Sequence, residues 1–162
     1  MAAEEPRNSA VEGRLEALGI SLPEVAAPVA AYVPAVVSGS HVYTSGQLPF
    51  IEGKLTATGK VGAAGGVDAE TASALAATCA VNALAAIKSQ LGDLDRITRI
   101  VKVVGFVASD PSFTGQPGVI NGASELLGTV LGDAGVHARS AVGVAVLPLD
   151  SPVEVEVVAE FV

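Results

Sequence analysis

Arg139 is the residue whose type and position first suggest chemistry. It lies in the segment GVHARSAVGVAVLP, residues 135–148, at the start of a run that otherwise has the composition of a buried strand. A guanidinium keeps its charge and does not enter a protein core unpaired. Arg139 therefore either points to solvent, as a surface arginine at a strand end does, or it holds an anion. A carboxylate would fit, because the planar guanidinium can donate two parallel hydrogen bonds to it.

Two carboxylates follow near the end of the chain. Glu154 and Glu156 alternate with valines in VEVEVV, so both side chains project from the same side of a strand. We expect one of them to lie beside the start of the neighbouring strand, near Arg139. A carboxylate next to a bound substrate can pass protons in general acid and base catalysis. The alternative is a pair of solvated glutamates on the wet face of a sheet.

Three further residues are weaker candidates. Tyr32 lies in an extended, proline-rich stretch and could form a pocket wall, although such a residue also packs without any function. Gly46 follows a strand in TSGQLP, where it permits either a turn or a close approach of the backbone to a ligand. His137 precedes Arg139 by two residues and could reach the same region, but a lone histidine is more often a structural hydrogen-bonding residue, and the sequence indicates no partner for it.

Several classes of function find no support in the residues. The two histidines are far apart, and Cys79 is the single cysteine in an apolar helical run, so we expect a buried thiol and no metal site. No phosphate-binding loop or nucleophile elbow is present, and we expect no cofactor. The net charge of −8 argues against a nucleic-acid partner. The N-terminus has no apolar signal region, and no stretch has the length and purity of a membrane span, so we expect a cytoplasmic protein without membrane contact.

The elements that must position these residues form a single α+β domain over residues 1–162, with an N-terminal helical and extended segment over 1–30. The patterns predict a hairpin over 36–45, a glycine-rich loop with a short hairpin over 50–66, helices over 68–92 and 117–131, and strands over 97–107, 140–147 and 153–162. Both long helices are expected on one face of the sheet. Half of the residues are apolar and only 16% are charged, so we expect a neighbouring subunit to cover the other face.

Three segments resemble the reactive intermediate deaminase family, also called Rid, YjgF-type or L-PSP. They are AAYVPAVVSGSHVYTSGQLP, GFVASDPSFTGQPGVIN and HARSAVGVAVLPLDSPVEVEVVA, and the resemblance covers roughly residues 30–160. It implies a chorismate-mutase-like mixed sheet with two helices on one face, assembled as a homotrimer with sites in the clefts between subunits. It also implies hydrolysis of reactive 2-imino and enamine acids to 2-keto acids and ammonia, without metal or cofactor.

The resemblance assigns roles to the candidate residues. Arg139 matches the arginine that holds the substrate carboxylate, and Glu154 matches the glutamate that handles water and protons. The substrate-binding positions are Tyr32, Gly46, Asn121 and the backbone N–H of Ala141. Many members carry a cysteine where this chain has Ala141 and a glutamate where it has Gly143. The loop over 52–66 and the N-terminal helix resemble a longer subgroup.

Other functions remain open for the same residues. A non-catalytic protein could use the cleft to bind a small carboxylate such as a keto acid. Family members have also been called endoribonucleases, but the acidic charge and the lack of a basic aromatic face argue against RNA. A chorismate-type enzyme would need to bind a dicarboxylate, and the single arginine near the site is too few cations for two carboxylates.

Overall fold

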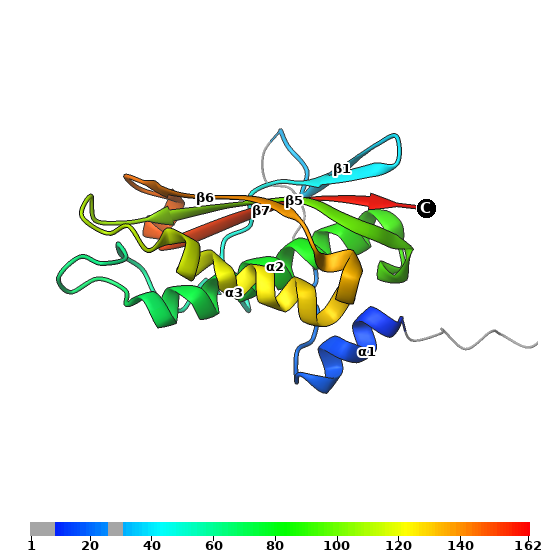
Figure 1. Ribbon diagram of the computed structural model, residues 1–162, viewed down its shortest axis with the longest axis horizontal. Coiled ribbons are helices and arrows are strands. Elements are labelled where there is room, and N and C mark those ends of the chain that lie inside the picture. The colour runs from blue at the N-terminus through cyan, green and yellow to red at the C-terminus, as the bar shows by residue number, and fades with distance from the viewer. Residues whose placement is uncertain (1–8, 26–30) are drawn as a thin grey trace, which may run out of the picture.

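A five-stranded mixed sheet forms one layer of the molecule (Figure 1). The computed structural model describes residues 9–25 and 31–162, so the expected N-terminal segment over 1–30 is described only in part. The strand order is β1-β2-β7-β5-β6, and only the pair β5 and β6 is parallel. The strands are β1 (Ala35–Ser38), β2 (His41–Thr44), β5 (Ile97–Ala108), β6 (Ala138–Val144) and β7 (Val153–Phe161).

The helices begin and end where the sequence predicts, for identifiable local reasons. The helices are α1 (Ala10–Ala17), α2 (Ala69–Leu91) and α3 (Gln116–Leu131), and the short hairpin is β3 (Phe50–Ile51) and β4 (Lys54–Leu55). The Asp68 carboxylate caps α2 by accepting from the Thr71 N–H at 2.8 Å. Gly92, at φ 78°, ends the same helix in the left-handed region that glycine tolerates.

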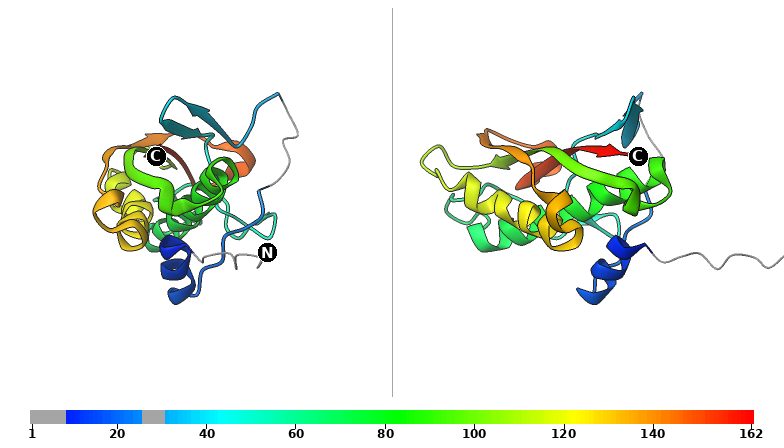
Figure 2. Two further views of the ribbon diagram at one scale, coloured as in Figure 1. Left: turned by 90° about the vertical axis from the view of Figure 1, so that its right-hand side faces the viewer. Right: turned by 45° about the vertical axis from the view of Figure 1, so that its right-hand side comes forward.

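Both long helices cover one face of the sheet, which confirms the predicted α+β layering (Figures 1 and 2). Their close approach depends on two glycines. A Cβ on Gly105 of β5 would lie 2.5 Å from the Ile120 side chain of α3, and one on Gly122 would lie 1.9 Å from the Ser73 carbonyl of α2. Helix α2 has the length and apolar composition of a membrane span, contrary to our expectation, but 61% of that window is buried inside the fold. It is the central core helix of the domain.

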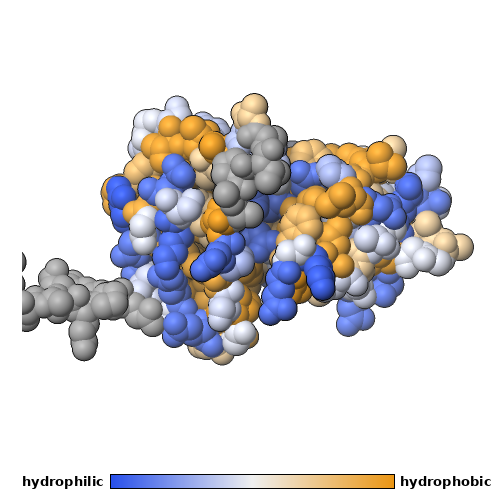
Figure 3. All heavy atoms as spheres, turned by 180° about the vertical axis from the view of Figure 1, so that it is seen from behind, coloured by the Kyte–Doolittle hydropathy of each residue, from blue (hydrophilic) through white to orange (hydrophobic). Residues whose placement is uncertain are grey.

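The other face of the sheet carries exposed apolar side chains, and no helix of residues 9–25 and 31–162 covers it. Side chains alternate along each strand, and those opposite the buried ones point to this face. Val36, Tyr43 and Val142 lie there with 53%, 44% and 44% of their surfaces exposed. Figure 3 shows hydrophobic residues gathered in patches along the upper part of the molecule, on the side of the sheet. This is the face for which the composition predicts cover by another subunit.

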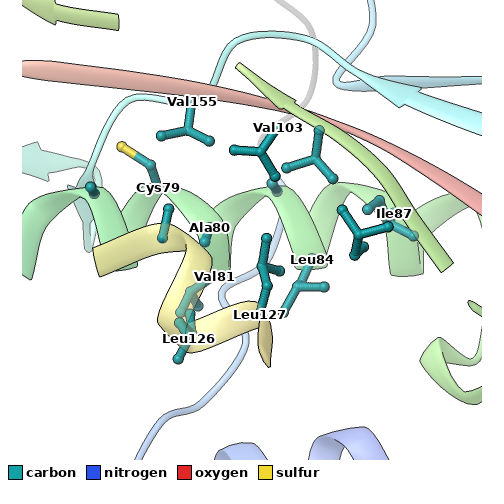
Figure 4. Packing of buried hydrophobic residues seen from close by; sticks show 14 of the residues in the cluster. Cys79, Ala80, Val81, Leu84, Ile87, Val103, Leu126, Leu127 and Val155 are labelled. Carbon is teal, nitrogen blue, oxygen red and sulfur yellow. The ribbon is translucent and has the colours of Figure 1, made fainter. Parts of the chain in front are cut away.

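Cys79 is buried in the core, as predicted. Its side chain is 0% exposed and lies on α2 beneath Val155 of β7 (Figure 4). Burial, together with the charge of Glu154, raises the pKa of the Cys79 thiol well above its ordinary value. The group is therefore an uncharged thiol that fills space.

Replacing Cys79 with serine is expected to lower the free energy of unfolding by about 1–3 kcal/mol, because a hydroxyl replaces an apolar thiol in a closed core. Urea denaturation measures this change, with Cys79→Ala as the matched control for volume. Ligand binding per folded molecule should persist. A serine variant as stable as the wild type would contradict the prediction.

Candidate functional site

The candidate residues fall into two separate clusters. The arginine cluster contains Arg139, Asn121, Ser124, His137 and the carbonyl of Pro117. The glutamate cluster contains Glu154, Gly46 and Tyr32. Each cluster is built by neighbouring elements, and the sheet separates the two.

The arginine cluster joins the edge strand β6 to helix α3. Arg139 is half-buried and its Nη1 donates to Asn121 Oδ1 at 2.7 Å and to Ser124 Oγ at 3.3 Å. Its Nη2 donates to the Pro117 carbonyl at 3.3 Å. Residues three and four apart share one face of a helix, so these three acceptors form a row along α3. Arg139 is thus held against the helix and does not extend freely into solvent.

These contacts leave part of the guanidinium free. A guanidinium has five N–H donors in a planar fork. Residues 9–25 and 31–162 accept three of them, which leaves the Nε donor and one Nη2 donor without a partner in that part of the chain. Two such donors match the two oxygens of a carboxylate. Arg139 therefore keeps two donors that are not used by the described residues.

The next positions on the same side of β6 are small. Ala141 packs partly against the core. A Cβ on Gly143 would lie 2.8 Å from Gln116 Nε2 and 2.9 Å from Ser109 Oγ. The Gln116 side chain thus lies where a side chain on Gly143 would point. Ser109, Gln116 and Gly143 also line an open depression of about 340 Å³.

The glutamate cluster lies at the junction of β2 and β7. The backbones of Gln47 and Val155 exchange two hydrogen bonds, of 2.8 and 3.0 Å, and this pairing places Gly46 directly against Glu154. A Cβ on Gly46 would lie 1.9 Å from Glu154 Oε1, so only glycine leaves room for the carboxylate.

Tyr32 belongs to the same region through the segment that precedes β1. The Ser45 hydroxyl donates to the Val33 carbonyl at 2.6 Å, and the Ser45 N–H donates to the Pro34 carbonyl at 2.8 Å. These bonds place Tyr32 next to the segment that carries Gly46. Its side chain is 64% exposed, so it does not form a closed pocket within one chain.

The electrostatic environment of Glu154 favours its protonated form. Its half-buried position raises the pKa of the carboxyl, and the nearby charge of Glu156 raises it further. The charge of Arg139 does not contribute to this shift, because the two side chains lie on opposite faces of the sheet.

The expected proximity of Arg139 to either glutamate is wrong within a single chain, because strand β5 lies between β6 and β7. Arg139 pairs with Val103 of β5, whereas Glu154 pairs with Phe106 three residues further along. An odd offset places the two side chains on opposite faces of the sheet. Two strand spacings and three residue steps separate their Cα atoms by about 14 Å.

Ser124, Gln116 and the histidine contact were not identified as site features from the sequence. His137, for which the sequence indicates no partner, reaches the arginine cluster through a contact of its Nε2 with Ser124 Oγ at 2.9 Å. The three-residue spacing of Asn121 and Ser124 on a helix was the available signal for Ser124. No group of three or more His, Cys, Asp or Glu side chains within the described residues is arranged to hold a metal ion.

Comparison with known proteins shows the family. The family model described as "YjgF/chorismate mutase-like, putative endoribonuclease" matches residues 12–161. The chain belongs to this family. A curated relative, Protein TCP17 of Trypanosoma cruzi, is 46% identical over 151 residues, which are 93% of each chain.

Solved structures share the fold. Atu1372 from Agrobacterium tumefaciens, a protein of unknown function, is 49% identical with a TM-score of 0.88, covering 94% of this chain and 93% of that one. The YjgF gene product of Escherichia coli is 28% identical with a TM-score of 0.60, covering 85% and 93%. The recognition of a YjgF-type chain and of its α+β fold is therefore confirmed.

Replacing Gly46 with alanine is expected to displace the Glu154 carboxylate, since the added methyl group would overlap Oε1. Once the carboxylate turns toward water, the pKa of Glu154 should fall toward the ordinary value for glutamate. An NMR titration of the side-chain carboxyl carbon measures the change. Gly13→Ala is the control, because a Cβ there meets nothing within 4 Å. An unchanged titration in Gly46→Ala would contradict the described packing.

Proposed function

We propose that this protein hydrolyses small 2-imino and enamine acids to 2-keto acids and ammonia, at sites that two subunits of a homotrimer build together. The observation that carries the proposal is the free pair of Arg139 donors on a guanidinium that α3 already holds in place. This arrangement suits the carboxylate that every 2-imino acid carries.

The reaction needs one proton-transfer group and a water molecule. Glu154 takes a proton from water as the oxygen attacks the imine carbon and gives it to the nitrogen, so that the carbon–nitrogen double bond becomes a single bond to an amino group. Glu154 then carries the hydroxyl proton of this carbinolamine to the amino group, which leaves as ammonia while the carbonyl of the keto acid forms. A raised pKa makes the Glu154 carboxylate a stronger base for the first of these transfers. Tyr32, Gly46, Asn121 and the Ala141 N–H complete the contacts in this proposal.

The separation of the two clusters argues for an intersubunit site. A carboxylate on Arg139 and a water molecule on Glu154 must meet within a few ångströms, which one chain does not allow across its own sheet. A neighbouring chain could bring its glutamate cluster to Arg139 and cover apolar surface at the same time.

A homotrimer is therefore expected in solution. Light scattering at micromolar concentration should give the mass of three chains. A stable monomer that still hydrolyses imines would remove the intersubunit site.

The activity is tested with iminopyruvate generated in the assay from an amino acid and an oxidase, by following the disappearance of the imine. Faster hydrolysis than in buffer supports the proposal. Binding of pyruvate by calorimetry without any acceleration would instead favour the alternative of a non-catalytic carboxylate-binding protein.

The family description also names an endoribonuclease activity. The net charge of −8 disfavours RNA as a partner of this chain, since phosphate binding needs a basic surface. Cleavage of single-stranded RNA by the purified protein, abolished by Glu154→Gln, would overturn this preference.

A further inference from the structure

We propose that Ser124 and His137 are positioning residues for Arg139, and that their hydrogen bonds determine which N–H groups of the guanidinium face the ligand. The inference rests on the proposed function, because it assigns Arg139 the substrate carboxylate. The inference adds two residues that do not contact the ligand but hold the guanidinium through hydrogen bonds.

The contacts of His137 determine its tautomer. One ring nitrogen, Nδ1, lies 2.6 Å from the Gly135 carbonyl, which can only accept a hydrogen bond. Nδ1 must therefore carry a proton. In the neutral ring Nε2 is then an acceptor, and it lies 2.9 Å from Ser124 Oγ. The Ser124 hydroxyl accordingly donates a hydrogen bond to His137 Nε2.

The direction of the Ser124 hydroxyl has a consequence for Arg139. The Ser124 hydroxyl directs its hydrogen toward His137 Nε2, so the lone pairs of the Ser124 oxygen are free to accept a hydrogen bond. Arg139 Nη1 lies 3.3 Å from this oxygen. The second Nη1 proton goes to Asn121 Oδ1 at 2.7 Å. Both Nη1 protons are thus used, and the chain of bonds runs from the Gly135 carbonyl through His137 and Ser124 to the guanidinium.

This arrangement selects the free edge of Arg139. Because both Nη1 protons are engaged, the remaining donors within the described chain are on Nε and Nη2. These nitrogens can form the side of the fork that binds both oxygens of one carboxylate. Without Ser124, a freed Nη1 proton would compete for the ligand, and the guanidinium could rotate away from its position against α3.

The first test measures pyruvate binding by calorimetry. Ser124→Ala is expected to weaken binding about tenfold, because a misaligned guanidinium loses one of its two parallel bonds. Ser124→Thr keeps the hydroxyl and should restore affinity to within about twofold. His137→Phe should weaken binding to a similar extent, and the double variant should be no weaker than either single one, since all act through one chain of bonds.

The control is Ser89→Ala, which removes a hydroxyl that bonds to the Ala86 carbonyl within α2 at 2.6 Å, away from this cluster. It should bind pyruvate like the wild type. Wild-type affinity in Ser124→Ala, or fully additive losses in the double variant, would overturn the proposal.

A second test does not depend on the proposed function. Nitrogen-15 NMR of the wild type at pH 8 should show His137 in the Nδ1–H tautomer, and Ser124→Ala should shift the Nε2 signal as its donor is lost. An Nε2–H tautomer in the wild type would overturn the inference. If the wild type binds no pyruvate, the carboxylate role of Arg139 fails by itself, and the NMR result still decides whether the chain of bonds exists.

Discussion

Replacing Glu154 with glutamine is expected to slow imine hydrolysis on the order of 100-fold or more, while pyruvate binding stays close to that of the wild type. Glutamine has nearly the shape of glutamate and fits against Gly46 in the same space, but it cannot take a proton from water. Arg139, which holds the carboxylate in this proposal, lies on the other face of the sheet and is not disturbed.

Glu154→Gln is expected to slow hydrolysis without lowering the free energy of unfolding. Because the folded state raises the pKa of Glu154, its favourable contribution to stability is present below the ordinary pKa of glutamate and is lost as the pH rises through the folded value. Glutamine is neutral at every pH. The variant should therefore be at least as stable as the wild type at pH 7, so lost activity would not reflect unfolding.

Kinetics, calorimetry and urea denaturation on the same preparations separate these effects. Glu160→Gln is the matched control, since it removes a carboxylate from the same strand at the end that pairs with His41, away from Gly46. Wild-type hydrolysis by Glu154→Gln would mean that Glu154 is an ordinary half-buried strand residue.

Mixing two inactive variants is expected to restore activity. If each site takes Arg139 from one chain and Glu154 from its neighbour, trimers that combine Arg139→Ala chains with Glu154→Gln chains contain some sites with both native residues. In a ring of three, a mixed trimer has such a pair at about one third of its sites, whichever variant supplies two of the chains. The purified mixed trimers should therefore recover up to about a third of the wild-type rate, although each variant alone is almost inactive.

Co-expression with two different affinity tags, followed by purification on both, gives the mixed trimers. Each variant purified with itself in the same way is the control. No recovery in verified mixed trimers would show that one chain supplies both residues to the same site, and the intersubunit geometry would be wrong.

The local elements were predictable from the sequence because their signals are local. Asp68 followed by Thr71 and closed by Gly92 defines α2, and Gly39 between two short β-branched segments defines the hairpin of β1 and β2. The alternation of Glu154 and Glu156 with valines predicted that they share a face, which the structure confirms. The resemblance of three segments to one family then indicated the fold and the candidate residues together.

Tertiary structure alone decided which candidates meet. The sequence places Arg139 fifteen residues before Glu154, and this short interval suggested neighbouring strands. Strand β5, from far earlier in the chain, lies between them, because a parallel pairing of β5 with β6 and an antiparallel pairing of β5 with β7 place it in the middle. Residue periodicity shows which face of its own strand a side chain takes, but strand order and register are determined by burial of the whole sheet against α2 and α3. For the same reason, only the folded chain shows that Ser124 hydrogen-bonds to both Arg139 and His137.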